Sequence, residues 1–267
     1  MNFLHKISIV LYLSIGLLQS DVIMGVVPQQ SPTKLLQTWR PIAEYLSEKI
    51  GEKVVFKTEK SIPEFESVLY SGGYDFAYMN PYHYVVAHKK QKYMAYVRAK
   101  KNIKGLVAAN KKSKMNFTDA NAQYVFPSPN AFAATLLIKY DLLQKYGVSL
   151  ETLSKARYVN SHDSVYKGIA RGFGDFGGGI ERTYKAIQDE SVKSQLKILY
   201  HTSEYPSHPF AFKSTMRGDK RQAIVDALLS IPDPLLAPLK MKKLKLVNNE
   251  EYDVVKDLAI KLQVMEK

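Results

Sequence analysis

The stretch Tyr74–Tyr84 has the sequence YDFAYMNPYHY and contains the pattern that decides the fold. Tyr74–Met79 is an apolar run of strand length, and Asn80-Pro81 follows it directly. Proline is well tolerated in the first turn of a helix, because the N–H that it lacks would have no partner there. The stretch therefore predicts a buried strand that leads at once into a helix ending near Lys90.

The same strand–helix alternation extends on both sides of this stretch. Parallel strands need crossover helices between them, so the alternation predicts a mostly parallel sheet that helices cover on both faces. The predicted neighbours are strand Val22–Val27, helix Ser31–Ile50, strand Lys53–Lys57, helix Ile62–Leu69 and strand Tyr93–Arg98.

A second block of alternating strands and helices occupies the middle of the chain, and the chain is predicted to be helical from Arg217 onward. Gly177-Gly178-Gly179 is interpreted as a flexible strand-to-helix turn. The predicted strands are 103–109, 124–126, 157–160, 175–176, 196–201 and 210–212, and the predicted helices are 130–146, 163–171 and 181–188.

These patterns predict an α/β protein of two lobes, each a mostly parallel sheet flanked by helices, with a ligand cleft between the lobes. Residues 103–203 have enough strands for a lobe of their own, whereas the segment after residue 204 has too few to stand alone. The economical division assigns residues 21–102 plus 204–267 to lobe 1 and residues 103–203 to lobe 2. The two chain crossings between the lobes would then act as a hinge.

Composition narrows the possible functions. The chain has 267 residues, of which 46% are hydrophobic, so it is long and apolar enough to bury a core. The absence of cysteine excludes disulfides, thiolate metal sites and cysteine nucleophiles. A net charge of +13 favours anionic partners, which include nucleic acid, acidic membrane surfaces and small oxyanions.

The first 20 residues have the layout of a secretory signal peptide. Lys6 precedes the apolar run Ile7–Leu18, and polar sequence follows from Gln19. The run is shorter than the ~20 apolar residues of a comfortable membrane span. We therefore expect export to the periplasm, with an uncleaved N-terminal membrane anchor as the alternative.

Four loops follow predicted strand ends, where α/β proteins collect ligands at helix N-termini. Each loop also has a structural explanation, such as a helix cap, a packed aromatic ring or a rigid proline turn. The candidate ligand residues are Gln30 and Ser31, Tyr78 and Asn80, Ser128, Asn130 and Ala131, His162 and Asp163, and, after the glycine turn, Glu181. Ser31 and Asp163 are also expected to cap their helices.

The sequence lacks the common catalytic motifs. G-x-S-x-G, P-loop and H-E-x-x-H patterns do not occur, and the histidines show no metal-ligand spacing. Ser161, His162 and Asp163 are consecutive, so they cannot form a catalytic triad. We therefore expect no catalytic residue, bound metal or cofactor. Nucleic-acid motifs are absent too, and Lys240–Lys245 is interpreted as a solvated helical face.

The order of several phrases resembles the phosphate/phosphite/phosphonate-type periplasmic substrate-binding proteins of ABC transporters. The resemblance covers residues 22–230 and implies a type II periplasmic-binding-protein fold that clamps a ligand between its lobes. The phrases are GVVPQQSPTKLLQTWRPIAEYLSEKIGEKV, YDFAYMNPYHYV, FPSPNAFAATLL, NSHDSVYKGIARGFGDFGGG and YHTSEYPSHPFAF.

The resemblance also implies roles for individual residues. Tyr78 and His162 match ligand-contacting positions, the segment Ser128–Ala131 matches the helix start that binds phosphonate oxygens, and Glu181 corresponds to an acidic ligand residue. Two features depart from the family pattern. A proline interrupts the expected Ser-Thr-Ser anion loop, and His208, a further candidate ligand residue, lies where aminophosphonate binders have an aspartate. An ammonium-bearing ligand would therefore lack its partner.

We expect a non-catalytic, monomeric binding protein that closes over a small anionic solute of the phosphonate, phosphite or phosphate type. Its partner would be an ABC permease or, alternatively, a membrane sensor kinase, and not nucleic acid. A competing hypothesis is an enzyme on the same scaffold, a hydrolase or transferase that uses His162.

Overall fold

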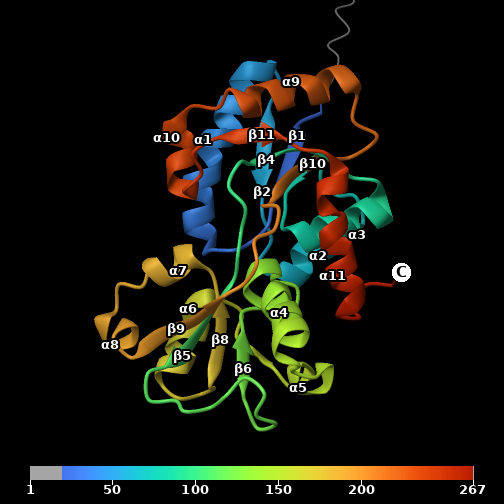
Figure 1. Ribbon diagram of the computed structural model, residues 1–267. Coiled ribbons are helices and arrows are strands. Elements are labelled where there is room, and N and C mark those ends of the chain that lie inside the picture. The colour runs from blue at the N-terminus through green and yellow to red at the C-terminus, as the bar shows by residue number, and fades with distance from the viewer. Residues whose placement is uncertain (1–19, 267) are drawn as a thin grey trace, which may run out of the picture.

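The computed structural model describes residues 20–266 and consists of two lobes, each built on one sheet (Figure 1). The predicted signal peptide lies outside the described residues, apart from Ser20. The first lobe contains a six-stranded sheet in the order β11-β4-β10-β3-β1-β2. Its strands are β1 (Val22–Val26), β2 (Val54–Lys57), β3 (Phe76–Tyr78), β4 (Met94–Ala99), β10 (Pro209–Phe212) and β11 (Leu244–Leu246).

The second lobe contains a five-stranded sheet in the order β7-β6-β8-β5-β9. Its strands are β5 (Leu106–Asn110), β6 (Tyr124–Phe126), β7 (Arg157–Tyr158), β8 (Phe176–Gly179) and β9 (Leu196–His201). In both sheets the strand–helix–strand units pair in parallel: β1 with β2 and β3, and β6 with β7 and β8. Antiparallel pairings join β10, β4 and β11 to the first sheet and β5 and β9 to the second.

Helices cover both faces of each sheet, as predicted. In the first lobe α1, α9 and α10 pack together, and α2, α3 and α11 lie on the other side (Figure 1). In the second lobe α4 packs against Tyr124 and Phe126, whereas α6 packs against Leu106 and Val125. The helices are α1 (Pro32–Ile50), α2 (Ile62–Tyr70), α3 (Pro81–Gln91), the π-helix η1 (Phe132–Leu136), α4 (Leu137–Tyr146), α5 (Leu150–Ser154), α6 (His162–Ala170), α7 (Glu181–Lys185), α8 (Glu190–Lys193), α9 (Gly218–Leu229), α10 (Asp233–Leu236), the short 3₁₀ turns η2 (Ala237–Leu239) and η3 (Asn249–Tyr252), and α11 (Asp253–Lys261).

The two chain crossings between the lobes lie side by side as a short antiparallel ribbon. Ile103 and Tyr205 exchange both backbone hydrogen bonds, each 2.9 Å long. Beside them, the backbone N–H of Gly105 donates to Thr202 Oγ1 at 2.9 Å. The lobes also touch at η1, where Phe132 and Leu136 join the core of the first lobe.

The structure differs from the sequence-based expectations at three segments. Gly177–Gly179 is part of the buried strand β8 and not a flexible turn. A side chain at Gly178 would approach the Ala134 carbonyl oxygen to 2.0 Å, so glycine is what lets η1 lie on this strand. The helix predicted at 130–146 begins as the π-helix η1. Lys240–Lys245 leads into the strand β11 instead of forming a helical face.

Candidate functional site

Three side chains of the first lobe meet where strands of its sheet begin or end. Tyr78 is the last residue of β3, and its ring stacks on that of His208, with the ring centroids 5.3 Å apart. The ring of Trp39 in α1 packs against the Tyr78 ring, with the ring centroids 4.7 Å apart, and so fixes the position of the phenol. Gln29, just beyond β1, places its Nε2 2.7 Å from His208 Nε2. These side chains form the first-lobe half of the site.

Arg182 comes from the second lobe and reaches this group. It lies in the first turn of α7, directly after β8, and its Nη2 donates to Gln29 Oε1 at 3.5 Å. Its Nε is buried and has no hydrogen-bond partner among the described residues. We call Gln29, Tyr78, His162, Arg182 and His208 the interlobe cluster.

The contact between Arg182 and Gln29 determines which ring nitrogen of His208 carries its proton. Because the guanidinium can only donate, it fixes the Gln29 oxygen on its own side and turns the amide nitrogen toward His208. That nitrogen can only donate, so His208 Nε2 must be an unprotonated acceptor. Burial and the charge of Arg182 lower the pKa of His208 to about 3, which agrees with a neutral ring.

His162 contributes a second imidazole from the other lobe. It is the first residue of α6, and its Nδ1 lies 3.3 Å from the Thr183 hydroxyl. Burial and Arg182 lower its pKa to about 4, so at pH 7 it too is neutral. Burial raises the pKa of Tyr78, with Arg182 acting in the opposite direction, so the phenol keeps its proton. Arg182 is therefore the charged member of the interlobe cluster.

A second polar network joins the lobes beside this cluster. Asn80 caps α3 by accepting from the His83 backbone N–H, and its Nδ2 donates to the Asn130 carbonyl oxygen at 3.0 Å. The Asn130 side chain in turn donates to Glu66 Oε1 at 2.9 Å. The same carboxylate oxygen lies 3.0 Å from Nε2 of the fully buried His83. We call Glu66, Asn80, His83 and Asn130 the interlobe latch.

The sequence-based candidates therefore fall into three groups. Tyr78, His162 and His208 lie in the interlobe cluster, and Asn80 and Asn130 lie in the latch. The remaining candidates take no part in either network, in the contacts that the structure gives them. They are Gln30, Ser31, Ser128, Ala131, Asp163 and Glu181. Ser31 and Asp163 are exposed, and the buried Ser128 accepts from Thr135 Oγ1 through its carbonyl oxygen. Glu181 pairs with Lys185 and His201.

Both capping predictions need correction. Ser31 occupies the N-cap position of α1 without a side-chain hydrogen bond. Ser161, and not Asp163, caps α6, because its hydroxyl accepts from the Ser164 backbone N–H. Asp163 instead lies in the first turn of the helix, where a carboxylate is favoured by the helix dipole.

Two residues of the interlobe cluster were missed by the sequence reasoning, and each is the chain neighbour of a predicted one. Gln29 precedes the candidate Gln30, and Arg182 follows the candidate Glu181. A basic residue in the turn after a strand was the available signal for Arg182. Which of two adjacent side chains faces the other lobe depends on the direction of the loop, and the sequence pattern does not contain that direction.

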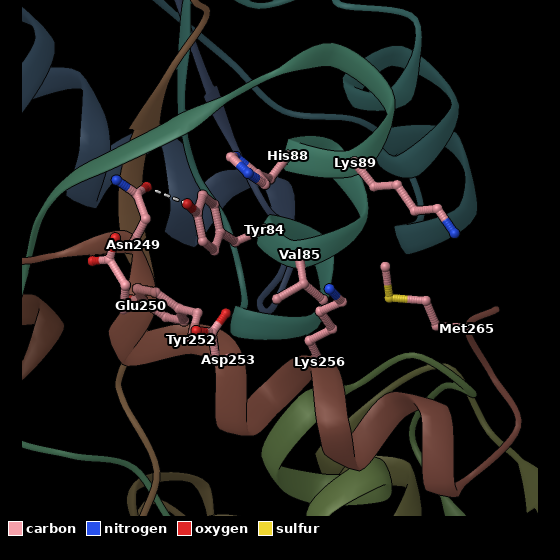
Figure 2. Close-up of a pocket in the computed structure, with 10 residues that line it drawn as sticks. All are labelled: Tyr84, Val85, His88, Lys89, Asn249, Glu250, Tyr252, Asp253, Lys256 and Met265. Carbon is pink, nitrogen blue, oxygen red and sulfur yellow. Dashed lines mark hydrogen bonds between the residues drawn. The ribbon is translucent and has the colours of Figure 1, made fainter. Parts of the chain in front are cut away.

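A separate pocket lies on the first lobe between α3 and α11 (Figure 2). Tyr84 and His88 of α3 and Lys256 of α11 line it, and the Tyr84 hydroxyl donates to Asn249 Oδ1. The pocket wall carries Glu250 and Asp253 as well as lysines, so its charges are mixed. It contains none of the predicted ligand residues and lacks the convergent donors of the interlobe cluster.

Comparison with known proteins decides the family. A family model described as "ABC transporter, phosphonate, periplasmic substrate-binding protein" matches residues 24–252. The chain belongs to this family. The two-lobed α/β fold and the role of a solute-binding component of an ABC transporter are thereby confirmed. Members are transport proteins of the periplasm, and within residues 20–266 the structure has no helix long and apolar enough to cross a membrane.

Solved structures share the fold at low sequence identity. PhnD1 from Prochlorococcus marinus, in complex with methylphosphonate, superposes with a TM-score of 0.81 at 16% identity, over 92% of this chain and 99% of that one. A binding protein component of an ABC phosphonate transporter from Pseudomonas aeruginosa superposes with a TM-score of 0.79 at 16% identity, over 92% of this chain and 87% of that one. XAC2383 from Xanthomonas citri, bound to chloride ion, superposes with a TM-score of 0.73 at 14% identity, over 91% of this chain and 98% of that one.

Proposed function

We propose that this protein binds a small phosphonate-like anion in the interlobe cluster and delivers it, as a monomer, to an ABC permease. The observation that carries the proposal is Arg182, a cation at the junction of the lobes whose buried Nε has no partner among the described residues. An unpaired buried donor on a charged group is costly unless a ligand satisfies it. An oxyanion would supply both the acceptor and the compensating charge.

The side chains around Arg182 support the same ligand class. Tyr78 presents a phenol, and each neutral imidazole, His162 and His208, has one N–H to donate. A phosphonate group has three acceptor oxygens, which could accept from these donors and from Arg182 together. Closing the lobes over such a ligand would remove it from water and strengthen each of these hydrogen bonds.

We further propose that the ribbon around Ile103 and Tyr205 is the hinge and that residues 21–102 plus 204–267 and residues 103–203 move as two units. Within residues 20–266, this backbone-paired ribbon carries both chain crossings between the lobes. Bending at two neighbouring crossings would change the angle between the lobes while preserving both sheets.

Replacing Arg182 tests the binding proposal. We expect Arg182→Gln to weaken methylphosphonate binding by about 100-fold, because hydrogen bonds to a charged group contribute roughly 1.5–3 kcal/mol. Isothermal titration calorimetry measures the affinity. Arg171→Gln, which changes an exposed arginine of the second lobe, is the matched control and should bind as the wild type does. Equal affinity of the Arg182 variant and the control would contradict the proposal.

The absence of turnover is tested on the same samples. We expect phosphorus NMR to show methylphosphonate unchanged after prolonged incubation with the wild-type protein, because the hydroxyl beside His162, that of Thr183, donates its proton to the Ile180 carbonyl oxygen and is not activated as a nucleophile. Accumulation of free phosphate, lost in His162→Ala, would instead support the hydrolase hypothesis.

A further inference from the structure

The charge balance of the interlobe cluster bears on which phosphonates it accepts. Five elements bring residues to the cluster: the segment after β1, β3, the segment before β10, and the starts of α6 and α7. They supply Gln29, Tyr78, His208, His162 and Arg182, and the uncharged Asn80 of the latch and Thr183 of α7 lie beside them. Arg182 alone among them carries a formal charge at pH 7.

Three carboxylates lie next to residues of the interlobe cluster or belong to the latch, and none of them forms an ion pair with Arg182 in the described structure. Asp163, next to His162 in the chain, is exposed to solvent. Glu66 binds Asn130 and His83 in the interlobe latch. Glu181, next to Arg182 in the chain, turns away to pair with Lys185 and His201. No ion pair between described residues involves Arg182, and its charge acts on Tyr78, His162 and His208 without an opposing carboxylate.

Such a site would distinguish phosphonates by the charge of the substituent on the phosphonate group. A phosphonate oxygen that accepts from Arg182 leaves the ligand's second substituent within the same small group of side chains. An ammonium there would face the guanidinium and two neutral rings, and juxtaposed like charges in a partly desolvated site cost several kcal/mol. A methyl group of the same size carries no such penalty.

We infer that Arg182, uncompensated by any carboxylate in the interlobe cluster, makes this protein selective for phosphonates without an amino group. The inference rests on the proposed function and adds a specificity determinant to it. His208 contributes through its neutral ring, which the relay from Arg182 through Gln29 holds in the acceptor form at Nε2. The selectivity thus arises from repulsion by Arg182 as well as from the lack of a partner for an ammonium.

Two ligands of equal size test the inference. Ethylphosphonate and aminomethylphosphonate differ only in a methyl group against an ammonium, and methylphosphonate serves as the reference. By calorimetry at pH 7 we expect ethylphosphonate to bind at least about tenfold more tightly than aminomethylphosphonate. In Arg182→Gln both affinities fall, and the ratio between the two ligands moves toward one. In Arg171→Gln the wild-type ratio persists.

The outcomes separate the inference from the proposed function. Equal or tighter binding of aminomethylphosphonate overturns the inference and leaves the proposed function standing. Binding of methylphosphonate with loss of both larger ligands shows that size selects, and it also overturns the inference. Binding of none of the three phosphonates overturns the proposed function and the inference with it. A ratio that stays at the wild-type value in Arg182→Gln shows that another residue sets the selectivity.

Discussion

At the scale of single residues, the two imidazoles of the interlobe cluster link the site to the stability of the fold. His208 and His162 have pKa values lowered to about 3 and about 4 by burial and by Arg182. In the unfolded chain each would titrate near its ordinary pKa of about 6.5. Between these values the unfolded state binds protons that the folded state does not, so stability rises with pH in this window and is lost as the pH falls.

This linkage predicts the pH dependence of unfolding. The wild-type protein should lose about 2 kcal/mol of unfolding free energy between pH 7 and pH 5 through His208 alone, because only the unfolded chain becomes protonated there. Urea titrations at the two pH values measure the loss. We expect His208→Gln to show a correspondingly smaller loss, whatever its absolute stability.

The control for this prediction is His201→Gln, which replaces an exposed imidazole of β9. This variant should still lose the part of the unfolding free energy that depends on His208 between pH 7 and pH 5. If His208→Gln loses as much stability as the wild type between pH 7 and pH 5, then His208 titrates normally in the folded protein. The assignment of a neutral His208 beside Gln29 and Arg182 would then be wrong.

At the scale of elements, β8 and η1 show why the second lobe is built with a run of glycines. A Cβ on Gly178 would lie 2.0 Å from the Ala134 carbonyl oxygen and 2.5 Å from the Phe126 ring. We therefore expect Gly178→Ala to lower the unfolding free energy by roughly 1–3 kcal/mol, because backbone and ring must both shift. Urea denaturation at neutral pH measures the change.

Gly168→Ala in α6 is the matched control for this substitution. The nearest heavy atom to a Cβ at Gly168 is 3.9 Å away, which is ordinary van der Waals contact. Alanine is also the better helix former by about 1 kcal/mol, so this variant should be equally or more stable. A Gly178→Ala protein as stable as Gly168→Ala would mean that β8 and η1 do not pack as closely as the structure has them.

At the scale of the whole molecule, the interlobe latch and the interlobe cluster both cross from one lobe to the other. Asn130 of the second lobe donates its side-chain N–H to Glu66 of the first and accepts from Asn80 through its carbonyl oxygen. Asn130→Ala removes the bond to the carboxylate and keeps the backbone contact. Because a hydrogen bond to a charged group contributes roughly 1.5–3 kcal/mol, we expect the open fraction of the ligand-free protein to rise about tenfold or more.

Single-molecule energy transfer between dyes on the two lobes measures this fraction. Asn121→Ala, which changes an exposed residue of the same lobe, serves as the control and should leave the distribution unchanged. The latch assignment would be wrong if Asn130→Ala and Asn121→Ala gave the same open fraction.

The sequence by itself determined the alternation of strands and helices and the two-lobed α/β fold, since hydrophobic periodicity and Gly and Pro positions are local properties. The family followed from the resemblance of several phrases in their order along the chain. The sequence also located Tyr78, His162 and His208. Only the tertiary structure decided that Gln29 and Arg182, and not their neighbours Gln30 and Glu181, face across the lobes. The reason is physical: the side chain that a loop presents depends on how the lobes come together, and that arrangement depends on contacts between residues more than 150 positions apart, as between Gln29 and Arg182.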